Sequence, residues 1–396
     1  MIALFALLLQ DETLLKELEG SDIPRVYRAL ETLAAGSPDA RAALGARAAA
    51  SSGRLKSHLL IAARGPVAPA RRITLAGPSR SVLEWAQELA RRADLPLNWD
   101  ALVDEKLPEV ALEARDVLPF EALAALGRAA DLGVSWEEGQ ILLFTGGYVD
   151  APASRFGSTQ LTLVRFKQER VVEFATPSRE TAELEATLAF EPSLPLLEVL
   201  GARVLEARDD KGADVLAPPE AQEERPDAGP LARPEALIAS SLTIKLRPLS
   251  RGARGLAVLR GEIDIRLPRA LRRVEIARPE TGATAKGRGF SVKVVSLIPQ
   301  ESRALLEIAI LDEALRKRPV IVTGCRADGR RERTLTSLVE VPDQGPIRVM
   351  LEIQPRGPAI RLDKEPMVPL DLLRVEVAED VDERALPFEY RGVTLR

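Results

Sequence analysis

The feature that most constrains this fold is an internal repeat, because residues 73–100 align with residues 110–137 without a gap. Identical residues recur at equivalent positions in the two copies: Leu75 and Leu112, Glu84 and Glu121, Leu89 and Leu126, Arg91 and Arg128, Asp94-Leu95 and Asp131-Leu132, and Trp99 and Trp136. Self-similarity at a fixed offset is typical of a repeated supersecondary unit. The repeat therefore predicts one small domain built from two matching pieces.

Each copy has the pattern of a strand, a helix and a second strand. A short apolar strand opens each copy, at 73–75 and at 110–112. Apolar residues at helical spacing follow, and they are Leu83, Ala86, Leu89, Ala90 and Ala93 in the first copy and Phe120, Leu123, Leu126 and Ala130 in the second. Closing strands are expected at 95–99 and 134–136, the latter continued by a hairpin into 141–144. We expect two helices on one face of a small sheet.

The second copy, VALEARDVLPFEALAALGRAADLGVSWEEGQILLF at 110–144, resembles the short N-terminal domain of secretins and TonB-dependent receptors, over residues 73–147. The first copy departs from that family's pattern at 77–80, where Gly-Pro-Ser-Arg replaces a short acidic turn. The matching positions are mostly hydrophobic residues that specify a fold. The resemblance implies an α+β module at 70–147 and a cell-envelope context, and it implies no catalytic residue.

The chain begins with a hydrophobic stretch, since the eight residues Ile2–Leu9 are all apolar. This stretch is far below the ~20 residues that a membrane-spanning helix needs. We expect residues 1–10 to be the remnant of a secretory signal peptide whose basic segment lies upstream of the assigned start. The alternative is a first helix packed on Leu14, Leu15 and Leu18.

Residues 11–65 are rich in alanine and resemble a single HEAT-type helical repeat. Ser21-Asp22 before Pro24, and Ser37 before Pro38, have the chemistry of helix starts, and Gly36 marks a helix end. One repeat cannot bury its own apolar face. We therefore expect this segment to dock on the module that follows it.

After Gly147 the pattern changes to short runs of alternating apolar and polar residues, which are typical of strands. We predict a β-sandwich at 154–280, with a mobile Pro-rich and charged loop at 217–234, and a second β domain at 284–396. One strand is expected at 256–267, where Gly261 is interpreted as a bulge or a close approach of two backbones. The last two strands are expected at 372–377 and 386–390. One larger sandwich is the alternative. This half resembles the C-terminal halves of bacterial envelope proteins that join helical repeats, a secretin-like short domain and β domains.

Composition argues against the common catalytic sets. The 396 residues hold one cysteine, Cys325, and one histidine, His58, which excludes an internal disulfide and a Cys/His zinc site. Cys325 follows a strand-like run and is interpreted as a buried thiol, and His58 as a structural or surface residue. The net charge of −4 with interspersed signs disfavours nucleic-acid binding. Lys286-Gly287-Arg288-Gly289 lacks the spacing of a phosphate-binding loop.

Three further features have a functional reading, but each fits a structural one better. Asp209-Asp210-Lys211-Gly212-Ala213-Asp214 has clustered carboxylates without EF-hand spacing, so a hairpin turn is preferred to a cation site. Trp99 and Trp136 are interpreted as core residues in preference to an aromatic surface that binds a ligand. The 59 acidic residues offer many possible pairs, but their positions fit solvent-exposed strand faces better than the catalytic carboxylate pair of a glycosidase.

The sequence thus predicts a multi-domain α+β protein: an N-terminal helical segment, a small βαββαββ module and an all-β, sandwich-type C-terminal half. No catalytic, cofactor-binding or metal-binding residue is assigned. We expect a non-enzymatic, exported binding or scaffold protein of the periplasm or cell envelope, without a membrane span, that contacts another envelope protein. The alternatives are a component of a secretin or TonB-type system, and a cell-wall glycan enzyme with a carboxylate pair.

Overall fold

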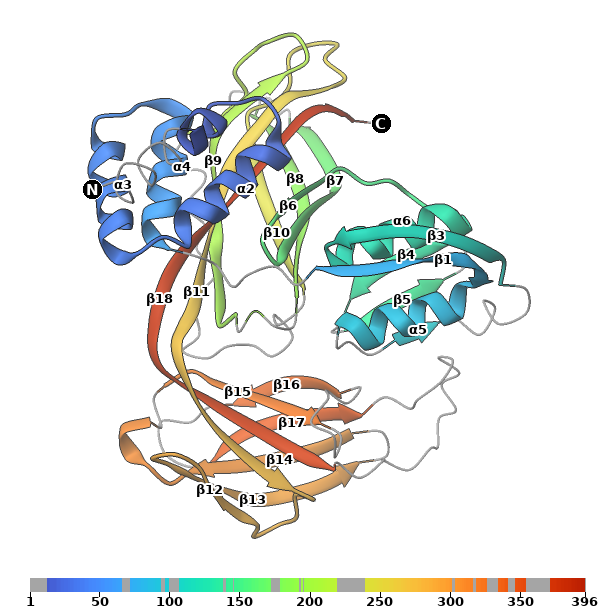
Figure 1. Ribbon diagram of the computed structural model, residues 1–396, viewed down its shortest axis with the longest axis vertical. Helices are drawn as coiled ribbons and strands as arrows, with labels where there is room; N and C mark the ends of the chain where they lie inside the picture. The colour runs from blue at the N-terminus through green and yellow to red at the C-terminus, as the bar shows by residue number, and fades with distance from the viewer. Residues whose placement is uncertain are drawn as a thin grey trace, which may run out of the picture.

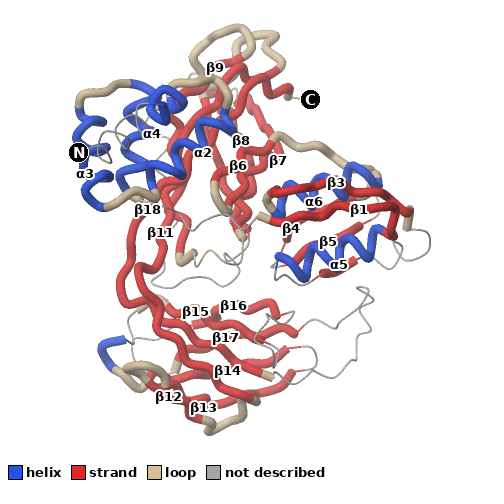
Figure 2. The backbone as a smooth tube through the Cα atoms, viewed as in Figure 1, coloured by secondary structure: helices blue, strands red, loops and turns tan. Residues whose placement is uncertain are grey.

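The computed structural model describes residues 13–65, 72–93, 97–99, 107–137, 140–144, 146–171, 179–191, 194, 196–218, 239–300, 303–315, 318–325, 334–340, 346–353 and 371–395. The chain forms an N-terminal helical segment, a small α+β module and two β lobes (Figure 1). Helices lie in the first two parts, and the described residues of the lobes form strands and loops apart from one short 3-10 turn, η3 (Glu313–Leu315) (Figure 2). The predicted mixed fold class is confirmed.

Helices α2 (Ile23–Ala34) and α3 (Pro38–Ala49) begin at the caps that the sequence predicts. A short helical stretch at 13–18 precedes them, and α4 (Gly53–Arg64) follows. The Asp22 side chain accepts a hydrogen bond from the Arg25 N–H at 3.3 Å, and Ser37 accepts one from the Ala40 N–H at 3.2 Å. Each cap satisfies a backbone donor that the first helical turn leaves free. The predicted signal-peptide remnant at 1–10 lies outside the described residues.

The module contains both copies of the repeat as strand, helix and strand. Its elements are β1 (Ile73–Ser81), α5 (Val82–Ala93), β2 (Leu97–Trp99), β3 (Glu109–Val117), α6 (Pro119–Ala130), β4 (Gly133–Glu137) and β5 (Gln140–Phe144). The opening strands β1 and β3 pair antiparallel with each other. The closing strands form a second sheet of order β2-β5-β4, with β2 parallel to β5. The two copies are therefore interleaved across two sheets.

This arrangement corrects the expectation of helices on one face of a single sheet. Both α5 and α6 contact strands of both sheets, so the helix pair lies between them. Four of the five residues predicted for the apolar face of α5 are buried, namely Ala86, Leu89, Ala90 and Ala93, whereas Leu83 is only half-buried. Val82 and Trp85, which the prediction left out, are buried and complete a single apolar stripe at helical spacing.

The first lobe is a closed pair of sheets. Its elements are β6 (Ala153–Phe156), β7 (Thr159–Val171), β8 (Arg179–Phe190), β9 (Glu198–Asp209), β10 (Ala239–Leu246) and parts of β11 (Gly255–Ala277) and β18 (Leu372–Thr394). The sheet β10-β8-β7-β6 faces β9, residues 255–267 of β11 and residues 381–394 of β18. The edge strand β6 lies against β18, and β10 lies against β9. Most of the predicted loop at 217–234 lies outside the described residues.

The second lobe repeats this closure. Its elements are β12 (Thr284–Lys286), β13 (Ser291–Gln300), β14 (Arg303–Ile310), β15 (Val320–Cys325), β16 (Thr334–Glu340) and β17 (Ile347–Ile353), together with the other ends of β11 and β18. The sheet β12-β13-β14-β17-β16 faces β15, β18 and β11 across a core of Val, Ile and Leu side chains. Here β12 lies against β11, and β16 lies against β15.

Two 23-residue strands, β11 and β18, run through both lobes as one antiparallel ribbon (Figure 1). The sequence predicted that β11 ends at Leu267 and that β18 is two strands. Register shifts occur after Pro268 and after Ala270, where the ribbon passes from one lobe to the other. Buried positions change there from Ile263 and Ile265 to Val274 and Ile276, so the alternation of the sequence is interrupted although the strand is not.

Ion pairs between the two strands run along the ribbon. Arg266 reaches Glu383 at 3.2 Å, Arg269 reaches Asp382 at 2.5 Å, Arg273 reaches Glu376 at 2.7 Å and Arg374 reaches Glu275 at 3.0 Å. Opposite charges on facing positions of an antiparallel pair favour one register over its neighbours. The many arginines of this chain are therefore used in part to fix the alignment of its longest strands.

The helical segment packs on the first lobe, which corrects its expected docking on the module. Leu30 and Leu59 share a buried cluster with Phe156 and Phe388, and α4 lies against β18. Six consecutive residues of β18, Ala385–Tyr390, are buried because the lobe covers one face and the helices cover the other. The module has its own core, which continues into Ala189, Leu197, Ile321 and Ala378 near the junction of the lobes.

Candidate protein interaction surface

The only cysteine and the only histidine are both structural. Cys325 is fully buried in β15, as predicted, and its Sγ lies 3.9 Å from the Thr323 carbonyl. His58 is buried in α4, and its Nδ1 lies 3.1 Å from the Leu18 carbonyl. Burial, reinforced by Arg54, lowers the pKa of His58 to about 4, which keeps the ring neutral. The two side chains lie in different parts of the chain and form no nucleophile–base pair.

The acidic stretch that begins at Asp209 forms the predicted turn. The buried Asp209 carboxylate accepts hydrogen bonds from the backbone N–H groups of Lys211 at 3.0 Å, Ala213 at 2.9 Å and Ser250 at 3.0 Å. Burial alone would raise the pKa of Asp209, but these bonds and the Ser250 hydroxyl hold the pKa below its usual value. Within the described residues no group of three His, Cys, Asp or Glu side chains could hold a metal ion.

The tryptophan that the structure describes in detail is Trp85, which sequence reasoning missed. Its ring is 2% exposed, its Nε1 donates to the Val110 carbonyl at 2.9 Å, and the Arg80 guanidinium lies 4.7 Å from the ring centroid. The i, i+4 spacing of Trp85 and Leu89 could have revealed it as a core residue. The side chains of Trp99 and Trp136 lie outside the described part of the structure, although their backbones belong to β2 and β4.

The densest cluster of buried charge joins the helical segment to the first lobe. The Glu389 carboxylate, 3% exposed, is 2.8 Å from both Arg54 and Arg391, and Glu262 is 2.7 Å from Arg203. A general acid and base would need groups free to exchange protons with a substrate. Here each carboxylate is held by an arginine, so this cluster is suited to docking the helices.

Polar contacts from Tyr27 complete that junction. Its hydroxyl lies 3.2 Å from Ser154 Oγ, which also accepts the Glu389 N–H at 3.1 Å. Burial raises the pKa of the Tyr27 phenol, so the hydroxyl stays protonated at neutral pH. These contacts hold the helical segment on the first lobe and position no reactive group of this junction toward solvent.

The module has a two-stranded sheet in which both strands are edge strands. In the sheet of β1 and β3 each strand is paired on one side only, and such edges present unpaired N–H and C=O groups that can pair with another chain. The edge of β1 is interrupted: Pro78 lacks an N–H group, the register shifts beside it, and Arg92 Nη1 donates to the Thr74 carbonyl at 2.6 Å. Proline, irregular register and a charged side chain all blunt an edge.

The edge of β3 is more regular. Ala111, Glu113 and Arg115 are exposed, whereas Leu112 and Ala114 between them are buried toward the helices. This alternation gives the sheet one face exposed to solvent and one face packed on the helices. Polar contacts from other elements fall near its ends, from Trp85 to the Val110 carbonyl and from Arg72 to the Asp116 carbonyl. We take the edge from Ala111 to Arg115 as the candidate interaction surface and call it the β3 edge.

Comparison with known proteins adds no relative to this geometry. The sequence matches no protein-family model, and no curated protein matches it. Among the described residues, no helix is both long enough and apolar enough to cross a membrane.

Proposed function

We propose that the protein is a non-enzymatic binding or scaffold protein, and that its module holds a partner through the β3 edge. The observation that carries the proposal is the contrast in edges. Every end strand is hydrogen-bonded on one side only, but the end strands of both lobes also lie against a strand of the facing sheet, whereas among the described residues β3 lies beside no strand other than β1. In β-strand addition, main-chain hydrogen bonds supply affinity and alternate side chains supply specificity.

The β3 edge also defines the kind of segment that fits it. A strand added beside β3 would set every second side chain on the same face as Leu112 and Ala114, over the helix layer. The intervening side chains would face solvent beside Glu113 and Arg115. The expected partner segment is therefore extended, about five residues long to match the β3 edge, and alternates apolar with polar residues.

A pair of variants at one position tests this proposal. Ala111 is exposed and lies at a register shift, without a paired residue in β1, so Ala111→Pro removes one β3 N–H group at the position where the β1–β3 ladder is already interrupted. Ala111→Gln changes the side chain and keeps the N–H group, which makes it the matched control. The full chain carrying each change is used to capture partners from envelope extracts, and the affinity for each recovered partner is then measured.

We expect Ala111→Pro to weaken partner binding at least tenfold, which is about 1.4 kcal/mol, and Ala111→Gln to bind like the unaltered protein. Tryptophan fluorescence reports on module folding, since all three tryptophans lie at 85, 99 and 136. Equal binding by the two variants, with both folded, would exclude the β3 edge. Failure of the unaltered protein to retain any partner would count against a scaffold role.

We also infer that the protein acts in the cell envelope and that its module is related to the short N-terminal domain of secretins and TonB-dependent receptors. Support comes from the pattern at 110–144 and from the pairing of strand–helix–strand copies within one module. Fractionation of producing bacteria, with protease added to intact spheroplasts, is the test. Protein that stays wholly protected in the cytosol would contradict the envelope assignment.

A further inference from the structure

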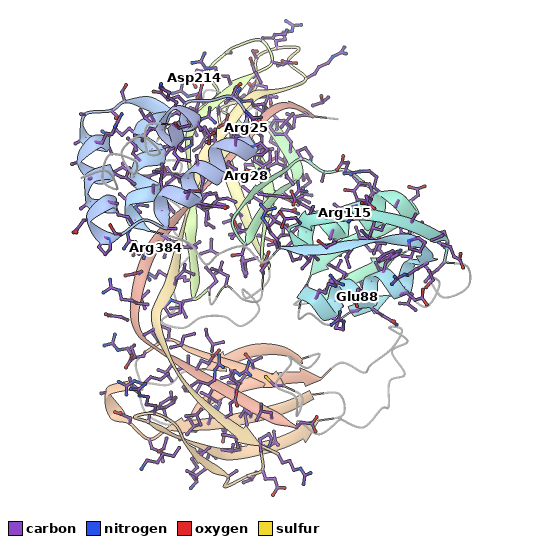
Figure 3. The ribbon with its side chains drawn as sticks, viewed as in Figure 1. Arg25, Arg28, Glu88, Arg115, Asp214 and Arg384 are labelled. Carbon is purple, nitrogen blue, oxygen red and sulfur yellow. The ribbon has the colours of Figure 1, made fainter. Side chains whose placement is uncertain are left out.

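Four exposed cations lie on two neighbouring loops at one end of the first lobe. They are Lys211, Arg247, Arg251 and Arg254, and we call them the cationic tip. Within the described residues none of the four side chains forms an ion pair. Figure 1 shows these loops projecting from the strand ends, and Asp214, labelled in Figure 3, lies at this end of the molecule, away from the second lobe.

Three acids, Asp209, Asp210 and Asp214, lie among the four cations, so the tip carries a net charge of +1. Each acid accepts backbone N–H groups, and within the described residues none forms an ion pair with a tip cation. Asp209 accepts the N–H groups described above and the Ser250 hydroxyl. Asp210 accepts the Arg254 N–H at 2.9 Å, and Asp214 accepts the Leu216 N–H at 3.0 Å. A carboxylate committed to backbone donors in this way is fixed in place by charge-assisted hydrogen bonds.

The same contacts make the tip a preorganised surface. Lys211 Nζ donates to the Arg251 carbonyl at 2.7 Å, the Arg247 N–H donates to the Val215 carbonyl at 2.8 Å, and the Asp210 N–H donates to the Gly255 carbonyl at 3.0 Å. The two loops are thus joined along their length, while the guanidinium groups of the three arginines remain in solvent. Binding at such a surface requires little ordering of the backbone.

The tip contrasts with the way arginine is used elsewhere. Along the ribbon, Arg266, Arg269, Arg273 and Arg374 each face a carboxylate. The whole chain carries a net charge of −4, whereas the four cations and three carboxylates of the tip sum to +1, so this end is locally positive on a negative molecule. An asymmetric charge distribution orients a protein toward an anionic surface before contact.

We propose that the cationic tip binds the anionic headgroup surface of a lipid bilayer. Phosphate is an anion that arginine contacts in a bidentate manner, and the three arginine side chains of the tip project from loop ends without an ion-pair partner among the described residues. Lipid headgroups diffuse to meet such cations one by one, whereas an acidic protein would need carboxylates in a matching fixed pattern. Each basic residue near an anionic bilayer contributes about a fivefold gain in partitioning, from ~1 kcal/mol.

The test uses the full chain and vesicles of phosphatidylcholine alone or of phosphatidylcholine mixed with phosphatidylglycerol, followed by sedimentation. The tip variant R247Q/R251Q/R254Q removes three charges whose side chains make no described contact and leaves Lys211, which holds a loop. The matched control R28Q/R288Q/K293Q removes three exposed cations that also lack described ion pairs and lie outside the tip. Unfolding temperatures of both variants establish that each is folded.

We expect binding to mixed vesicles that weakens with added salt, a loss of about 100-fold in the tip variant and a loss below about threefold in the control. Four results would each overturn the proposal: no binding to mixed vesicles, equal binding to phosphatidylcholine alone, equal losses in the two variants, or no loss in the tip variant. Tip-dependent binding of soluble polyglutamate without vesicle binding would overturn it in favour of an acidic protein partner.

Discussion

The module and the two β lobes handle the same problem, the unpaired edge of a sheet, in opposite ways. In each lobe the end strands of the facing sheets lie against each other, β6 against β18 and β10 against β9 in the first, β12 against β11 and β16 against β15 in the second. In the module, β3 pairs with β1 alone among the described residues. Covered edges protect a sheet from association and open edges permit it, and this difference is the basis on which we propose support for the lobes and recognition for the module.

The largest effect is expected from Phe388→Ala, which tests whether the lobes fold as a unit separate from the module. Phe388 is 1% exposed and lies in the core that joins β18 to the helical segment. Truncation should cost about 3–5 kcal/mol and lower the denaturation midpoint seen by far-ultraviolet circular dichroism. Tryptophan fluorescence, which reports on the module alone, should keep its midpoint. A shared shift of both signals would show that module and lobes unfold together.

A pH effect of nearly equal size should appear only where the helices meet the first lobe. His58 has a pKa of about 4 when folded against 6.5 when unfolded, so the unfolded chain takes up the proton first as pH falls. Stability is therefore complete above about pH 6.5 and falls by up to about 3 kcal/mol on the way to pH 4.

Urea denaturation at pH 7 and pH 5 measures this effect, because most carboxylates stay ionised above pH 5. His58→Gln should remove the slope while the module signal stays constant. A slope that survives in the variant would assign the titration to another group.

Gly261→Ala should have a smaller effect and sharpens the account of lobe packing. A Cβ atom at this position would lie 2.3 Å from the Arg203 carbonyl oxygen and 2.4 Å from the Phe388 ring. Relief of that overlap should cost about 1–3 kcal/mol. Gly45→Ala is the matched control, because a Cβ atom there would lie 3.7 Å from its nearest neighbour, an ordinary contact distance. Gly282→Ala is not used, because the φ of +88° at that glycine would itself strain an alanine. Equal stability of the two variants would contradict the close approach.

The smallest effect belongs to the module surface. Hydrogen bonds from Arg91, together with Arg92, lower the pKa of Glu88 to about 2 despite the opposing effect of burial. The stabilisation from ionised Glu88 is therefore complete above its unfolded pKa of about 4.5, and it is lost as the pH falls toward 2. Because the group is partly solvated, Glu88→Gln should cost only about 0.5 kcal/mol. Fluorescence-detected denaturation in low and high salt tests this, and a cost above that of Gly261→Ala would reverse the predicted order.

The sequence was sufficient for features that depend on neighbouring residues. Helix starts at Asp22 and Ser37, the turn at Asp209 and the close approach at Gly261 each follow from local chemistry, and each appears in the structure. The repeat predicted both strand–helix–strand copies because the hydrophobic period changes within each one. These signals act over a few residues, so a single sequence records them.

The features that sequence reasoning missed depend on long-range contacts. Pro268 and the register shifts beside it broke the alternation that would have marked β11 as one strand, although pairing with β18 continues across them. The docking of α4 on β18 joins residues far apart in the sequence, such as Arg54 and Glu389 at 2.8 Å, so no local pattern records it. The β3 edge is likewise visible only once β1 and β3 are known to pair with each other alone.

Amide hydrogen exchange of the full, unliganded chain tests the central claim most directly. If β3 has an open side, alternate amides between residues 111 and 115 should exchange faster than those at 259–265 and 385–390, which lie in the closed first lobe. Equal protection of β3 and these lobe segments would show that the β3 edge is covered, and the assignment of recognition to the module would then be wrong.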